Sequence, residues 1–124
     1  MEPQPSRAWF FFSPSGRISR GPYALGLLFW FMLQFAAIGQ MFAGQRLHSD
    51  GLLILGFLAL IVIGLVGTVS MIMLTIKRAH DLGHPGLLAF LIIVPVVSFF
   101  ALVFFLLFPS APPNDYGYDT NRPR

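Results

Sequence analysis

The sequence contains few charged residues. Only 10% of its 124 residues are charged, whereas 56% are hydrophobic. A soluble domain of this size carries about 25% charged residues, because water has to solvate most of its surface. This chain has too few polar groups to cover a water-soluble sphere, so we expect a lipid bilayer to be its solvent.

Cysteine is absent, which excludes disulfides, thiolate catalysis and cysteine-ligated metal or iron–sulfur sites. The sequence also lacks a nucleophile elbow, a phosphate-binding loop and a paired-carboxylate pattern. We therefore predict that the protein is not an enzyme and that it uses no cofactor. A lipid-modifying activity carried by His80 and Asp81 is the enzymatic alternative.

The net positive charge of the chain does not indicate a nucleic-acid partner. The net charge is +3, but the basic residues are few and lie beside apolar runs. Lys and Arg in such positions usually fix the orientation of a membrane protein. We therefore expect contact with a lipid surface and no binding of nucleic acid.

Three long apolar runs organise the chain, at residues 23–43, 52–76 and 87–108. Each has the length of about 20 residues that a helix needs to cross about 30 Å of hydrocarbon. Lipid offers no hydrogen bonds to the backbone, and the runs lack the alternation of barrel strands, so helices are expected. The sequence predicts an all-α membrane protein, in which three transmembrane helices form a compact antiparallel bundle and a single domain. An interfacial segment over 1–21 precedes it, and a polar tail over 109–124 follows.

Pro95 interrupts the third apolar run. Proline removes one backbone hydrogen bond and bends a helix, so we predict a spanning helix that is kinked near Pro95. The alternative is a re-entrant hairpin that turns at this residue. Its two legs would have about 8 and 13 residues, too few for either to cross the membrane.

The Lys and Arg residues near the ends of the runs predict the orientation. The N-terminal segment and the loop over 77–86 together carry five, whereas the loop over 44–51 and the tail carry three. Cytoplasmic segments are enriched in Lys and Arg. We therefore predict a cytoplasmic N-terminus and, with three full spans, a C-terminus on the opposite side.

Three polar motifs flank the runs: one before the first run, one between the second and third, and one in the tail. Their residues are, in chain order, Gly16, Arg17, Ser19, Arg20 and Tyr23; Arg78, His80, Asp81 and Gly83; and Asn114, Tyr116 and Gly117. In this order and spacing the motifs resemble the DUF805 family of small bacterial inner-membrane proteins. The resemblance extends from about Phe12 to Gly117. It implies a bacterial inner-membrane location and no established molecular activity.

The chain departs from the pattern of that family at several positions. Ala79 stands where the family usually has Leu, and His84-Pro85 stands where it usually has Arg-Ser. Ala24 and Leu87 replace residues that are usually Trp. The resemblance therefore supports no aromatic contact at those two positions and no cationic contact at the turn.

Antiparallel packing of the first two helices would bring the first two motifs to one membrane face. The candidate site there consists of Arg17, Arg20, Arg78, His80 and Asp81. One interpretation is that these residues only lock the helix ends and set the topology. The other is a site for an anionic ligand or lipid headgroup, because clustered arginines bind phosphate and basic pockets bind acidic lipids.

No metal site is predicted. His80 and His84 are spaced to share one face of a helix, but Gly83 and Pro85 make a continuous helix there unfavourable.

The sequence favours a non-enzymatic interaction or structural protein of the inner membrane. Its expected partners are the bilayer, anionic lipids, and further copies or a larger membrane assembly. The alternative is a small oligomeric transport or channel component that uses the basic cluster as its entry site.

Overall fold

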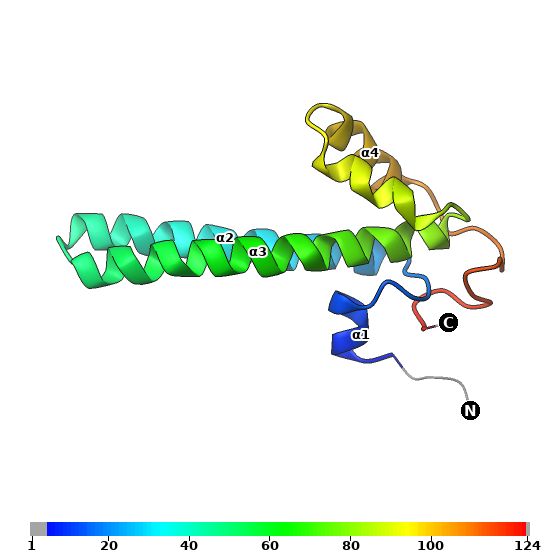
Figure 1. Ribbon diagram of the computed structural model, residues 1–124, viewed down its shortest axis with the longest axis horizontal. Coiled ribbons are helices and arrows are strands. Elements are labelled where there is room, and N and C mark those ends of the chain that lie inside the picture. The colour runs from blue at the N-terminus through cyan, green and yellow to red at the C-terminus, as the bar shows by residue number, and fades with distance from the viewer. Residues whose placement is uncertain (1–4, 124) are drawn as a thin grey trace.

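The computed structural model describes residues 5–123, which fold mainly into helices joined by short turns (Figure 1). Residues 1–4 of the predicted interfacial segment and the last residue of the tail lie outside the described residues. The helices are α1 (Arg7–Phe12), α2 (Arg20–Arg46), α3 (Asp50–Asp81), the 3₁₀ helix η1 (Gly86–Ile93) and α4 (Val97–Leu107).

α2 and α3 form a long antiparallel pair that extends well beyond the other elements (Figure 1). Both helices are long and apolar enough to cross a membrane. At 1.5 Å per residue they measure about 40 and about 48 Å, against about 30 Å of hydrocarbon. They extend past the predicted runs over 23–43 and 52–76 because their polar ends also find helical hydrogen bonds.

Polar side chains pair across the α2–α3 contact. The indole N–H of Trp30 donates to the Ser70 hydroxyl at 2.9 Å. The Tyr23 hydroxyl lies 3.0 Å from the Thr75 hydroxyl, which itself donates to a backbone carbonyl of its own helix. These buried groups therefore find partners inside the helix pair and need none from lipid.

The third apolar run is a hairpin and not a single kinked span, so the prediction of one helix over 87–108 is wrong. η1 and α4 are separated by a tight turn in which Val96 has a φ of 69°. Pro95 has no N–H with which to continue the helical ladder. The run begins beside the last turns of α3, where Gly86 lies against Ile76, and it ends there too, because Arg78 bonds the Phe105 carbonyl.

The hairpin also changes the predicted bundle. η1 and α4 lean away from the α2–α3 pair and do not run along it as a third bundle helix (Figure 1). The predicted compact three-helix bundle is therefore replaced by one long pair with a short hairpin at its base.

α1 packs on the α2–α3 pair near the end of α3 and, in Figure 1, on the side away from the hairpin. Ser6 caps it by accepting the N–H of Trp9 at 3.1 Å. The ring of Phe11 lies 5.1 Å from that of Phe29 and 6.0 Å from that of Trp30. The predicted interfacial segment thus includes a short helix anchored by aromatic contacts.

The tail runs back to the same end of the pair. Arg17 and Arg122 form an isolated antiparallel bridge, and Figure 1 shows α1 and the tail at the end of the α2–α3 pair where α3 ends. The tail therefore lies at the same end of the pair as α1, whereas the predicted three-span path would take it to the opposite end. The reason is the hairpin, which returns the chain to the side from which it left.

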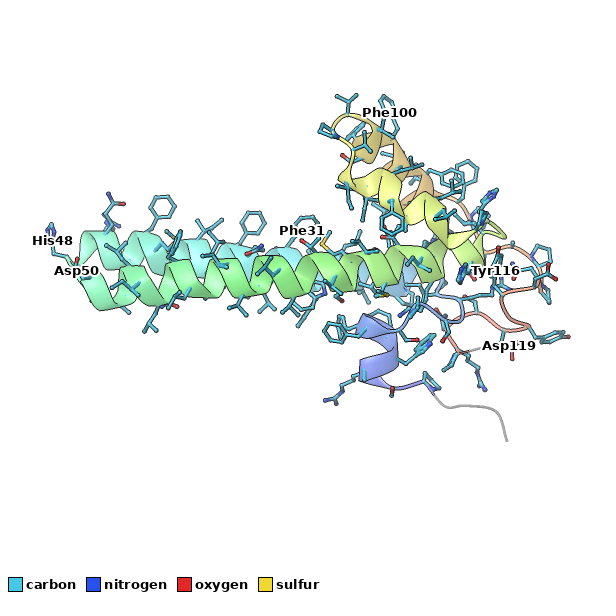
Figure 2. The ribbon with its side chains drawn as sticks, in the orientation of Figure 1. Phe31, His48, Asp50, Phe100, Tyr116 and Asp119 are labelled. Atoms are coloured by element: carbon cyan, nitrogen blue, oxygen red, sulfur yellow. The ribbon has the colours of Figure 1, made fainter. Side chains whose placement is uncertain are left out.

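The main cluster of buried apolar side chains lies at this end of the molecule, where Trp9, Tyr23, Leu74, Ala101 and Phe105 come together. Along the rest of the pair, large apolar side chains point outward (Figure 2). Their exposed fractions include 67% for Leu25, 64% for Phe42 and 67% for Leu65. This outer surface resembles the lipid-facing side of a membrane helix more than the charged surface of a soluble protein.

Candidate functional site

The three polar motifs meet around the last turn of α3. This helix ends in a Schellman motif, in which the Gly83 N–H donates to the His80 carbonyl and the His84 N–H to the Ala79 carbonyl, at 3.0 and 2.9 Å. Gly83 has a φ of +81°, which an L side chain adopts at a cost. The chain therefore turns sharply here, and the tail can pack against the end of the helix.

Asp81 is the centre of the cluster and is fully buried. One carboxylate oxygen accepts from Arg17 Nε at 3.1 Å, and the other accepts from Arg78 Nη1 at 2.6 Å. The Ser110 hydroxyl also donates to the second oxygen. A carboxylate buried between two guanidinium groups and further hydrogen bonds is the arrangement that makes burial of charge tolerable.

Arg17 is 2% exposed, and each of its five guanidinium N–H groups has an acceptor. Nε binds the Asp81 carboxylate, and the two Nη groups donate to backbone carbonyls at 2.6 to 3.3 Å. Those carbonyls belong to Asp81, Ala111, Pro112 and Gly117. One side chain near the start of the chain thus holds the whole first half of the tail.

Arg78 and Arg20 hold the end of α4. Arg78 Nε donates to the Phe105 carbonyl at 2.7 Å, and its Nη2 donates to the Phe108 carbonyl. Arg20 Nη1 donates to the Leu107 carbonyl at 2.9 Å. The last carbonyls of a helix have no partner within it, so the two arginines satisfy groups that lipid could not.

His80 connects the first motif with the third. Its Nδ1 lies 3.1 Å from the Gly16 carbonyl oxygen, and its ring stacks on Tyr116 at 4.1 Å with the planes 2° apart. Asn114 donates to the His80 carbonyl at 3.0 Å and accepts the Tyr116 N–H at 2.9 Å. The tail motif is therefore a clamp on the end of α3.

The remaining motif residues shape the backbone. Gly16 has a φ of +89°, and a Cβ there would clash with the Arg122 carbonyl oxygen. The Ser19 N–H and hydroxyl both donate to the Asn121 side-chain oxygen, at 2.8 and 3.2 Å. Gly117 exchanges backbone hydrogen bonds with Asn114, which closes the turn that the Arg17 guanidinium binds.

Lys77 is a functional side chain that the sequence analysis missed. Its ammonium donates to the Trp9 and Ser13 carbonyls at 2.7 and 2.9 Å and also to the Phe10 carbonyl. It lies 4.8 Å from the centre of the Trp9 ring. In the sequence, Lys77 contributes only to the count of basic residues that predicts orientation. Its position at the end of an apolar run is the one feature that could have indicated a structural role.

The cluster is therefore closed rather than open to a ligand. Arg17, Arg78 and Asp81 are buried and bound to their own chain, His80 is half-buried, and Arg20 is exposed. Among residues 5–123, no three His, Asp or Glu side chains are placed to hold a metal ion. The arrangement can fix three segments to one another and leave positive charge at the surface, carried by Arg20.

No curated protein and no solved structure matches the chain. A family model described as "Protein of unknown function (DUF805)" matches residues 11–118. This range contains all three polar motifs, both long helices and the hairpin. The chain therefore belongs to the DUF805 family.

Proposed function

We propose that this protein is a non-enzymatic interaction or structural component of the bacterial inner membrane. α2 and α3 cross the bilayer, and the polar cap, which we define as residues 5–19, 77–85 and 109–123, lies at one surface. The observation that carries the proposal is the closed cluster around Asp81, whose two arginine partners are buried and bound within the chain. Catalysis or entry of a solute would need such groups to face a ligand.

The distribution of Lys and Arg supports a cytoplasmic polar cap. Of the seven that the structure describes, six lie at the end of the pair where the cap is, and Arg46 alone lies at the other end. This difference is larger than the five against three counted from the sequence, because the tail lies at this end of the pair and not at the other. An imbalance of this size is typical of a cytoplasmic segment.

The exposed contact with anionic headgroups is assigned to Arg20. One of its N–H groups donates to the Leu107 carbonyl, and its side chain lies at the surface where α2 enters the membrane. Arg17 and Arg78 share the single carboxylate of Asp81, and Arg20 interacts electrostatically with Arg78, so the three arginines exceed this carboxylate in charge. Acidic headgroups at the cytoplasmic leaflet are the natural counterions of such a site.

Lipid binding to the purified protein tests this proposal. Short-chain phosphatidylglycerol and phosphatidylcholine are titrated against the wild type, Arg20→Ala and Arg46→Ala, at low and high salt. We expect Arg20→Ala to weaken phosphatidylglycerol binding and to reduce its salt dependence, because it removes an exposed positive charge beside the polar cap. Arg46→Ala makes the same change in net charge at the far end and should bind like the wild type. Equal effects of the two substitutions would contradict the headgroup site.

A further inference from the structure

The η1–α4 hairpin is an apolar element with no partner over its outer surface. Residues 86–108 contain no charged side chain. Phe99 and Phe100 are 66% and 67% exposed, and Val96 at the turn is 74% exposed. Figure 2 shows Phe100 at the tip, pointing away from the α2–α3 pair. Exposing such an apolar surface to water is unfavourable on a small protein, so an apolar partner or solvent covers it.

The length of the hairpin identifies what covers it. Eight residues of 3₁₀ helix in η1 rise about 16 Å at about 2.0 Å each. Eleven residues of α helix in α4 also rise about 16 Å. The hydrocarbon of one leaflet is about 15 Å deep, half of the usual total. An element of this length that starts at one surface reaches the middle of the bilayer and no further.

The base of the hairpin is fixed at the level of the polar cap. Arg20 and Arg78 hold the carbonyls at the end of α4, and Gly86 at the start of η1 lies against Ile76. Both arms therefore start from the same depth. The tip cannot move toward the far surface without breaking these contacts.

The turn at the tip suits an apolar solvent. The backbone N–H groups of residues 97–99 donate to the carbonyls of residues 94–96, at 2.8 to 3.2 Å. Pro95 brings no N–H that would need a partner. The N–H groups of residues 97–99 therefore need no acceptor from hydrocarbon, where an unpaired group is costly.

We propose that the η1–α4 hairpin is a wedge inserted into one leaflet only, the leaflet on the side of the polar cap. Its occupant is the acyl-chain layer of that leaflet, which also fills the open groove of about 270 Å³ between its arms, lined by Leu88, Leu91, Phe100 and Phe104 among others. The inference rests on the proposed crossing of the membrane by α2 and α3. It means that four helical segments displace lipid in one leaflet and two in the other. The protein therefore favours bilayers that are convex on the side of the polar cap.

Depth measurements with spin labels test the wedge, and the absence of cysteine makes single-cysteine variants clean. Leu65→Cys marks the middle of α3, Phe100→Cys the hairpin tip and Tyr118→Cys the polar cap. Each labelled variant is reconstituted into phospholipid vesicles, and collision with oxygen and with a water-soluble nickel complex reports depth. We expect the label at 65 to be deep, the label at 118 to be in water, and the label at 100 to lie in hydrocarbon no deeper than that at 65.

The outcomes separate the two proposals. A label at 65 in hydrocarbon with a label at 100 in water, or on the far side of the bilayer, overturns the wedge alone. A label at 65 in water overturns the membrane crossing and the wedge together.

Partition between small and large vesicles tests the consequence for curvature. Protein inserted with the cap outward should be enriched in the small, highly curved vesicles. Val96→Asp with Phe100→Asp places charge at the tip and should abolish the enrichment, whereas Tyr118→Asp on the exposed tail should keep it. Equal partition of the wild type between the two sizes would overturn the wedge.

Discussion

At the scale of single residues, Asp81 compensates two buried positive charges. Replacing it with Asn leaves the Arg17 and Arg78 guanidinium groups without a counter-charge where water does not reach. Breaking a buried pair by removing one partner costs about 3–5 kcal/mol. We expect Asp81→Asn to lower the free energy of unfolding by that order, measured by denaturant unfolding in detergent. Asp119→Asn on the exposed tail is the control, and equal stability of the two variants would contradict the role of Asp81.

Lys77 gives a second prediction at this scale. Its ammonium binds the carbonyls at the end of α1, including that of Trp9. Lys77→Met keeps the aliphatic length but leaves these carbonyls without their charged donor, at a cost of about 1–3 kcal/mol. We expect α1 to detach more often and Trp9 fluorescence to become more accessible to iodide. Arg46→Met should leave the quenching unchanged, and a wild-type quenching curve for Lys77→Met would show that α1 is held otherwise.

At the scale of elements, the turn between η1 and α4 carries backbone strain. Val96 has a φ of 69°, a region that β-branched residues rarely adopt and that costs about 1–3 kcal/mol. We therefore expect Val96→Gly to raise the thermal unfolding temperature in detergent. Val94 has a φ of −78°, so Val94→Gly removes no strain and should lower that temperature. A lower unfolding temperature for both variants would mean that the turn stores no strain.

The two long helices could be predicted from sequence because apolar length alone requires them. The predicted runs over 23–43 and 52–76 lie inside α2 and α3. The third run has the same length and composition, but its path depends on where Arg20 and Arg78 find acceptors. Hydropathy carries no information about these hydrogen bonds, so it does not distinguish a kinked span from a hairpin.

The candidate site was only partly predictable for the same reason. Antiparallel helices were enough to bring Arg17 near Asp81 and Arg78. Four of the five N–H groups of Arg17 bind backbone carbonyls, three of them to residues in the tail. Every residue has a backbone carbonyl, so the sequence does not show which carbonyls will accept hydrogen bonds. Nothing in the tail therefore indicated that it would bury this arginine.

At the scale of the whole molecule, the hairpin makes a prediction about topology. If α2 and α3 cross the bilayer as proposed, the polar cap and the α2–α3 loop lie on opposite sides of it, because they lie at opposite ends of the helix pair (Figure 1). His48→Cys and Tyr118→Cys are treated with a membrane-impermeant thiol reagent that reaches only the periplasmic side of cells with intact inner membranes. We expect labelling at 48 and none at 118 until the inner membrane is permeabilised. Labelling at both positions in the intact cells would fit the three-span arrangement instead, and labelling at 118 alone would reverse the proposed orientation.

The clamp on Arg17 also sets an order of events during synthesis. Arg17 leaves the ribosome early, but its carbonyl partner Gly117 lies 100 residues later in the chain. Until the tail emerges, most of the donors of this guanidinium lack their native partners and remain in water at the membrane surface. The polar cap therefore closes only after the tail has been synthesised. Removal of the tail would leave three of the five N–H groups of Arg17 without their native acceptors.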